Sequence, residues 1–182
     1  MTTVDTGFDP LTRVGSAGGT KWAVFEWGSR GPFTAVGVAM SGFSDLNARY
    51  GHQTGDEVLI EVARRIGATI PPVPDSYLGR IGGDSFLVLA AISDVQEASI
   101  LARRIREAVE VPLRVGVANI EPRARLVVVP VHAARATPMT LPGLPSSWSI
   151  GGKERPDLIA LVRAALDRMP PDGDPILVLE PA

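Results

Sequence analysis

Polar residues that could bind a metal ion or a polar ligand gather in two short patches of the sequence. The first patch, residues 43–56, contains the amide of Asn47 and the carboxylate of Asp56. The second patch, residues 80–86, contains the run Gly82-Gly83-Asp84. Because hard divalent cations prefer oxygen ligands, the carboxylate of Asp84 is a candidate metal ligand.

Each of these residues also has a structural explanation. Asp56 fits the first turn of a helix, where a carboxylate is favourable to the helix dipole. Asn47 could close a turn, and Gly82 and Gly83 are typical residues of a hairpin turn, in which Asp84 could be a plain turn acid. Residue types alone therefore leave both interpretations open.

The strands that position these patches are predicted from apolar runs. Residues 34–40 are apolar and rich in β-branched residues, which predicts a buried strand. Residues 77–81 and 85–91 flank the glycine pair, which predicts a hairpin. Further strands are predicted at 113–118, 126–133 and 176–179.

Helix starts are predicted from capping residues and proline. The run Thr54-Gly-Asp-Glu57 fits a capping box with Thr54 as N-cap, and residues 93–96 fit a second one. Pro156 suits the first position of a third helix. Residues 21–27 fit a helix or a strand equally, and the proline and glycine residues within 135–155 predict a long loop.

Composition narrows the class of protein. The chain has 182 residues with 45% hydrophobic and 21% charged residues, which is typical of one globular domain. The net charge of −2 and the absence of a basic stripe argue against a nucleic-acid partner. The chain has no cysteine, so disulfides and thiolate metal sites are excluded. The sequence also shows no signal peptide and no apolar run long enough for membrane insertion, so we expect a cytoplasmic protein.

The order and spacing of the motifs resemble the GGDEF family, to which the diguanylate cyclases belong. The two patches match the family pattern, and Asp9-Pro-Leu11-Thr12 resembles its opening motif. The resemblance implies an α/β (α+β) fold of the GGDEF/nucleotidyl-cyclase-like type. This fold has a central mixed, mainly antiparallel sheet of about five strands, helices on both faces and a central Gly-Gly hairpin. We expect a flexible N-terminus over residues 1–8 and a single domain over residues 9–182.

The resemblance also implies roles for individual residues. In the family, a divalent metal is held by the first Asp of a D-x-D motif, the next backbone carbonyl and the first acidic residue of the hairpin turn. The turn acid corresponds to Asp84 here. Guanine is read by the positions of Asn47 and Asp56. We expect the nucleotide-binding residues to be Asn47, Asp56, Phe43, Gly82 and Gly83.

Several family residues needed for catalysis are replaced in this sequence. The first Asp of D-x-D is Ala39, the phosphate-binding Lys is Ser44, and the second turn acid is Ser85. The basic pair near the chain end is missing from residues 169–173, and the product-inhibition motif R-x-x-D is missing from residues 73–76. We therefore expect no catalytic residues and no bound cofactor.

These departures favour a degenerate domain without catalysis, acting as a nucleotide-binding or regulatory module in cyclic-dinucleotide signalling. Its expected partners are a guanine nucleotide and a protein partner or a second copy. The alternative is a divergent active diguanylate cyclase or nucleotidyltransferase that uses GTP and Mg²⁺. A third possibility is an interaction domain that has lost nucleotide binding.

Overall fold

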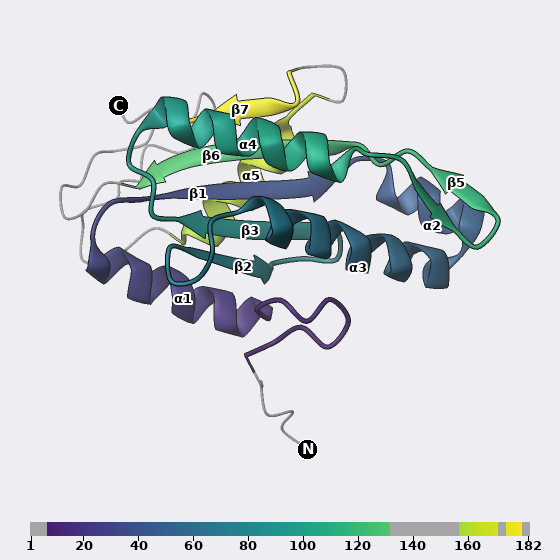
Figure 1. Cartoon of the computed structure of the whole chain (residues 1–182), viewed down its shortest axis with the longest axis horizontal. Coiled ribbons are helices and arrows are strands. Elements are labelled where there is room, and N and C mark those ends of the chain that lie inside the picture. The colour runs from purple at the N-terminus through teal and green to yellow at the C-terminus, as the bar shows by residue number, and fades with distance from the viewer. Residues whose placement is uncertain (1–6, 132–156, 171–173, 180–182) are drawn as a thin grey trace.

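The computed structural model describes residues 7–131, 157–170 and 174–179. Five strands form one sheet in the order β2-β3-β1-β6-β7 (Figure 1). Helices cover both of its faces, so the predicted α/β (α+β) class is confirmed. The strand bounds are Phe33–Met40 (β1), Ser76–Arg80 (β2), Ser85–Ala90 (β3), Ala124–Val131 (β6) and Ile176–Val178 (β7).

The sheet is mainly antiparallel, as predicted. β1 is central and pairs antiparallel with β3 and β6, and β2 pairs antiparallel with β3. β7 lies parallel to β6 at the far edge. The β2–β3 pair is the predicted hairpin, and its turn contains the glycine pair.

Side chains of β1 alternate between two apolar cores, because successive residues of a strand point to opposite faces. Val36 and Val38 face a core shared with α3 (His52–Thr69) and α4 (Val95–Val109). Ala35 and Ala39 face the other core, which is shared with α1 (Ala17–Arg30) and α5 (Leu158–Arg168). In Figure 1, α3 and α4 lie in front of the sheet and α5 lies behind it.

The ambiguous segment 21–27 is helical and lies within α1. The N-cap of this helix is Ser16, whose side chain accepts a hydrogen bond from the N–H of Gly19. Trp27 is buried, but Trp22 and Phe25 are 65% and 54% exposed and stack at 5.7 Å between ring centroids. Apolar residues on both sides of the helix explain why its pattern did not predict one structure.

Helix starts differ from the capping predictions at three places. Thr54 is not an N-cap, since α3 begins at His52 and the Thr54 hydroxyl donates to the carbonyl of Tyr50. The N-cap of α4 is Asp94, one residue after the predicted Ser93. Helix α5 begins at Leu158 with Asp157 as N-cap.

The predicted strand 113–118 is instead a short hairpin. β4 (Leu113–Val115) and β5 (Ala118–Ile120) form a separate two-stranded sheet. Gly116, at φ 58°, makes the turn between them, a conformation that favours glycine. Residues 1–6, Pro156 and the predicted loop 135–155 lie outside the described residues.

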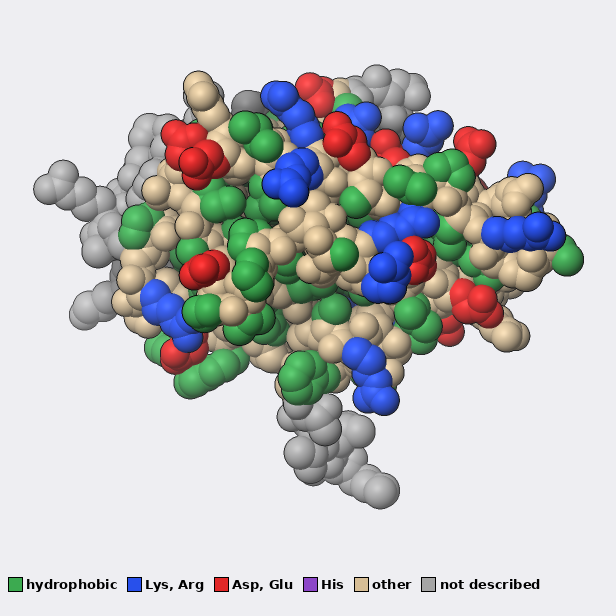
Figure 2. Space-filling view, in the orientation of Figure 1, with side chains coloured by type: hydrophobic (Ala, Val, Ile, Leu, Met, Phe, Trp, Pro, Cys, Tyr) green, Lys and Arg blue, Asp and Glu red, His purple; other side chains and the backbone are tan. Residues whose placement is uncertain are grey.

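The surface charges and the composition of the helices bear on the expected partners and on membrane insertion. On the face shown in Figure 2, basic and acidic side chains are interspersed rather than gathered by sign. None of the helices in the described ranges is both long enough and apolar enough to cross a bilayer.

Candidate functional site

The candidate site lies where β1 ends, at the right-hand end of the sheet in Figure 1. The N–H of Met40, the last residue of β1, donates to the carbonyl of Asp84 in the β2–β3 turn at 3.2 Å. After β1 the chain turns at Gly42, with φ 67°, and enters α2 (Phe43–Tyr50). The fold thus brings both sequence patches to one end of the sheet.

Arg80 ties the glycine turn to the N-terminal motif. Its Nε and Nη2 atoms donate to the carbonyls of Gly82 at 3.2 Å and Gly83 at 2.5 Å. Its Nη1 atom forms an ion pair with Asp9 at 3.2 Å. Asp9 also accepts hydrogen bonds from the N–H and hydroxyl of Thr12, at 2.8 and 2.7 Å. The opening motif therefore supports the shape of the turn.

This network also sets the pKa of Asp9. Burial raises the pKa, but the hydrogen bonds from Thr12 and the hydrogen bond and charge of Arg80 outweigh burial. The result is a pKa below the ordinary value of an aspartate.

Ala39 and Ser85 face each other across β1 and β3. They are Cα partners in the register, so their side chains lie on the same face of the sheet. Ala39 is 5% exposed within the core under α5. The hydroxyl of Ser85 donates to Oδ1 of its neighbour Asp84 at 3.1 Å.

The residues at this position do not fit the divalent metal that the family pattern implies. Asp84 is the one carboxylate at the turn, and Ser85 already occupies one of its oxygens. Ala39 has no ligand atom in its side chain. Within the described ranges, no group of three or more His, Cys, Asp or Glu residues could hold a metal ion, and Asp45 on the exposed side of α2 joins no such group.

The guanine-reading positions meet at the corner between α2 and α3. Oδ1 of Asn47 is buried and has no hydrogen-bond partner in the described part of the chain. A Cβ on Gly55 would lie 1.9 Å from that atom and 3.2 Å from Cζ of Phe43, so all three residues touch. Asp56, the residue after Gly55, is exposed on α3. Ser44 is exposed on α2.

Sequence reasoning missed two arginines near the end of β1. Arg125 is the β6 register partner of Ala39, and Arg163 of α5 lies against the glycine turn, with Nη2 3.1 Å from where a Cβ of Gly82 would be. Arg125 comes directly before the apolar run of the predicted strand 126–133, and this position was the one sequence signal that it could be a functional residue. Only the register of β1 and β6 shows that it lies beside Ala39.

The chain resembles proteins of one family. Residues 26–133 match the family model described as "Diguanylate cyclase, GGDEF domain". The chain is 39% identical over 79 residues to the "Probable diguanylate cyclase DgcT" of Escherichia coli, covering 43% of this chain and 17% of that protein. It is 32% identical over 83 residues to the bifunctional diguanylate cyclase/cyclic di-GMP phosphodiesterase MucR of Pseudomonas aeruginosa, covering 46% of this chain and 12% of that protein. The chain thus matches less than a fifth of the length of either relative.

Two solved structures share the fold. The diguanylate cyclase SiaD of Pseudomonas aeruginosa, in complex with its activator SiaC, superposes with a TM-score of 0.70 at 23% identity, covering 89% of this chain and 57% of that chain. The coiled coil and GGDEF domain of DgcB from Caulobacter crescentus, in complex with c-di-GMP, superposes with a TM-score of 0.72 at 18% identity. The match covers 96% of this chain and 86% of that chain. At these identities the likeness establishes the fold alone.

Proposed function

The chain belongs to the diguanylate cyclase GGDEF domain family, and we propose that it is a degenerate member of this family without cyclase activity. It binds a guanine nucleotide and acts as a regulatory or protein-interaction module in cyclic di-GMP signalling. A cytoplasmic location belongs to the same proposal, since GTP is a cytoplasmic nucleotide.

The observation that carries this proposal is the pairing of Ala39 with Ser85. Family chemistry joins two GTP molecules by attack of a 3′-hydroxyl on an α-phosphate, which needs a metal and charge stabilisation. In this chain Ala39 replaces the first Asp of D-x-D and Ser85 replaces the second turn acid, at directly opposed positions on adjacent strands, and only the first turn acid, Asp84, remains. Losing one preorganised charge contact commonly lowers the rate by about 10²–10³, and here Ser44 is a further loss.

Guanine binding is supported by the Asn47 corner. An unpartnered buried carbonyl oxygen is unfavourable unless a ligand donates to it. Guanine presents N1–H and N2–H₂ donors, which suit an amide oxygen and the carboxylate of Asp56. Adenine lacks this donor pair, so adenine nucleotides should bind more weakly.

The product-inhibition position supports loss of feedback. Val73 is 84% exposed and apolar, and Ser76 is 5% exposed. The Ser76 hydroxyl donates to the carbonyl of Pro71 and so belongs to the loop itself. We therefore propose that this segment holds no cyclic di-GMP.

A protein partner or a second copy is the expected receiver of the signal. The solved complex of SiaD with its activator SiaC is an example of a GGDEF-fold protein with a protein partner.

The test is calorimetric titration with GTP, GDP, ATP and cyclic di-GMP, with and without Mg²⁺, beside an assay for cyclic di-GMP synthesis. We expect a Kd for GTP between about 10 μM and 1 mM, weaker ATP binding and no product. Asp56→Ala and Asn47→Ala together should abolish the preference for GTP over ATP. Glu57→Ala, which removes the next exposed carboxylate of α3, should leave it unchanged.

Four results would contradict the proposal. Equal binding of ATP and GTP, or a preference for GTP that survives the double substitution, would show that there is no guanine site. Product formation that is abolished by Asp84→Ala establishes the active alternative. No nucleotide binding at all leaves only the interaction-domain function.

A further inference from the structure

We propose that Arg125 and Arg163 turn the family's metal position into a metal-independent site for the phosphoryl groups of a nucleotide. This inference deepens the proposed function and rests on it for the nature of the nucleotide. It reverses the sequence-based expectation that the phosphate-binding cations are gone. The cations come from different elements, β6 and α5.

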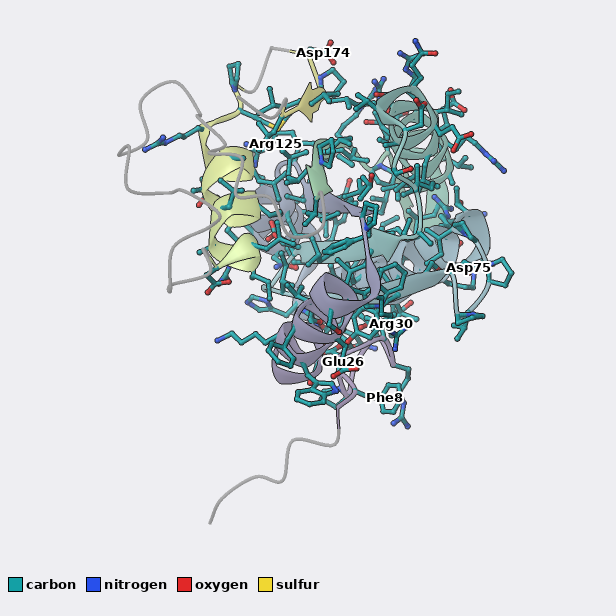
Figure 3. All side chains as sticks on the ribbon, turned by 90° about the vertical axis from the view of Figure 1, so that its left-hand side faces the viewer. Phe8, Glu26, Arg30, Asp75, Arg125 and Asp174 are labelled. Atoms are coloured by element: carbon teal, nitrogen blue, oxygen red, sulfur yellow. The ribbon has the colours of Figure 1, made fainter. Side chains whose placement is uncertain are left out.

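Arg125 places a cation directly beside Ala39. The two residues are register partners on β6 and β1, so both side chains lie on the face covered by α5. Nη1 of Arg125 donates to the carbonyls of Leu166 and Met169 at 3.1 and 3.3 Å, at the end of α5. Figure 3 shows Arg125 next to this helix. These bonds fix the guanidinium at the end of β1.

The remaining donors of Arg125 are incompletely used. Its Nε atom is buried and has no hydrogen-bond partner among the described residues. A buried donor without a partner is unfavourable by the desolvation of that group. An anion over Ala39, where the family pattern has an aspartate, would relieve this deficit.

Arg163 brings a second cation to the other side of Ala39. Its Nη2 atom lies against Gly82. A Cβ added to Gly82 would lie 3.1 Å from this Nη2 atom and 3.5 Å from the Cβ of Ser85. Arg163 is exposed, and no ion pair holds it within the described ranges. It is therefore available to a ligand.

The charge balance of the site favours an anion over a cation. Arg125 and Arg163 bring two positive charges to the neighbourhood of Ala39 and Gly82, whereas the turn has the single carboxylate of Asp84, which already accepts from Ser85. Guanidinium groups bind phosphate through paired, charge-assisted hydrogen bonds. Because the cations flank Ala39 from β6 and from α5, a chain of two or more phosphoryl groups suits them better than a single one.

The test uses inorganic pyrophosphate, which has no base, titrated by calorimetry in EDTA and again in Mg²⁺. We expect saturable binding in EDTA that Mg²⁺ does not strengthen. Arg163→Gln should weaken it at least about tenfold, the loss of one charged hydrogen bond. The matched control Arg103→Gln, an exposed arginine of α4 on the opposite face, should change affinity less than about twofold.

A second variant, on β1 rather than on α5, tests the site without changing a residue of the helix. Ala39→Asp puts a carboxylate on the register partner of Arg125, and it should also weaken pyrophosphate binding at least about tenfold in EDTA. The inference is overturned if pyrophosphate fails to bind, if it binds only with Mg²⁺, or if Arg163→Gln and Arg103→Gln have equal effects. Failure of guanine selectivity in the titrations above would leave this result standing, since pyrophosphate does not report on the base.

Discussion

At the residue scale, Asp9 shows how a distant motif holds the candidate site. The Asp9 side chain is 17% exposed, so solvent screens its ion pair with Arg80 only in part. Arg80 in turn holds both glycine carbonyls of the turn. The conformation of the turn therefore depends on a carboxylate that is 71 residues away in the sequence.

Asp9→Asn should lower the free energy of unfolding at pH 7 by about 1–3 kcal/mol, because it removes a hydrogen-bonded charge. The folded-state pKa is lowered. The stabilisation is thus complete above the unfolded-state pKa and disappears as the pH falls through the folded-state pKa. Urea unfolding from pH 7 to pH 2 should show the variant and the wild type converging in acid. A constant difference at all pH values would contradict this assignment, and Asp75→Asn, at an exposed position before β2, is the control.

Alanine substitutions at Gly55 and Gly67, both on α3, should change the stability of the protein in opposite directions. The Cβ of Gly55→Ala would meet Oδ1 of Asn47, so we expect a loss of about 1–3 kcal/mol and weaker guanine binding. At Gly67 a Cβ meets only Cδ2 of Leu78, at 3.9 Å, so alanine should stabilise α3 by about 0.5–1 kcal/mol. Urea midpoints and GTP titrations measure both effects. Equal changes for the two variants would show that Asn47 does not pack against Gly55.

At the element scale, the predictions succeeded where the apolar pattern alone decides structure. β1, the β2–β3 hairpin and the body of α3 and α4 follow from such patterns. Helix starts did not follow, because more than one residue near each start can cap. Thr54 could have capped α3, but its hydroxyl bonds the carbonyl of Tyr50 from inside the helix. The β4–β5 hairpin had a signal in Gly116, since glycine inside a strand pattern often marks a turn.

Arg65 links α3 to α4, so replacing Arg65 should lower the free energy of unfolding more than replacing its neighbour Arg64 does. Its Nη1 atom donates to the carbonyls of Ala108, Val109 and Val111 at the end of α4, and its side chain is 11% exposed. Arg65→Ala should lower the free energy of unfolding by about 2–3 kcal/mol.

The control is Arg64→Ala, since both arginines pair with Glu61. The Arg64 side chain is 67% exposed, so solvent screens its ion pair and its loss should change stability much less than the loss of Arg65 does. Chemical denaturation of both variants measures the difference. Similar losses would mean that the pairing with Glu61, rather than the bonds to α4, is the stabilising contact.

At the scale of the whole molecule, the sequence predicted the family and the fold but only part of the candidate site. Ala39, Ser85 and Asp84 could be placed because they lie within contiguous motifs. Arg125 and Arg163 could not, because their position beside Ala39 depends on strand register and on the packing of α5. Such contacts join segments far apart in the chain, and no local pattern records them.

The two cores should unfold as one unit, which tests the proposal that residues 9–182 form a single domain. The strands of one sheet line both cores, since Val36 and Ala35 of β1 face opposite sides. Ile66→Ala in one core and Leu166→Ala in the other should each lower stability by about 2–5 kcal/mol. Ile100→Ala, at a position 53% exposed on α4, is the control and should have a small effect.

The measurement compares far-UV circular dichroism, which reports all helices, with the near-UV signal, to which Trp27 contributes from its packing against Phe33 at 5.8 Å. In a two-state transition both signals follow one urea curve. Each core substitution should therefore shift both curves together to lower urea. If Leu166→Ala shifted the near-UV curve alone, the face under α5 would unfold separately. The metal-independent site proposed at its edge would then belong to a less stable unit than the sheet.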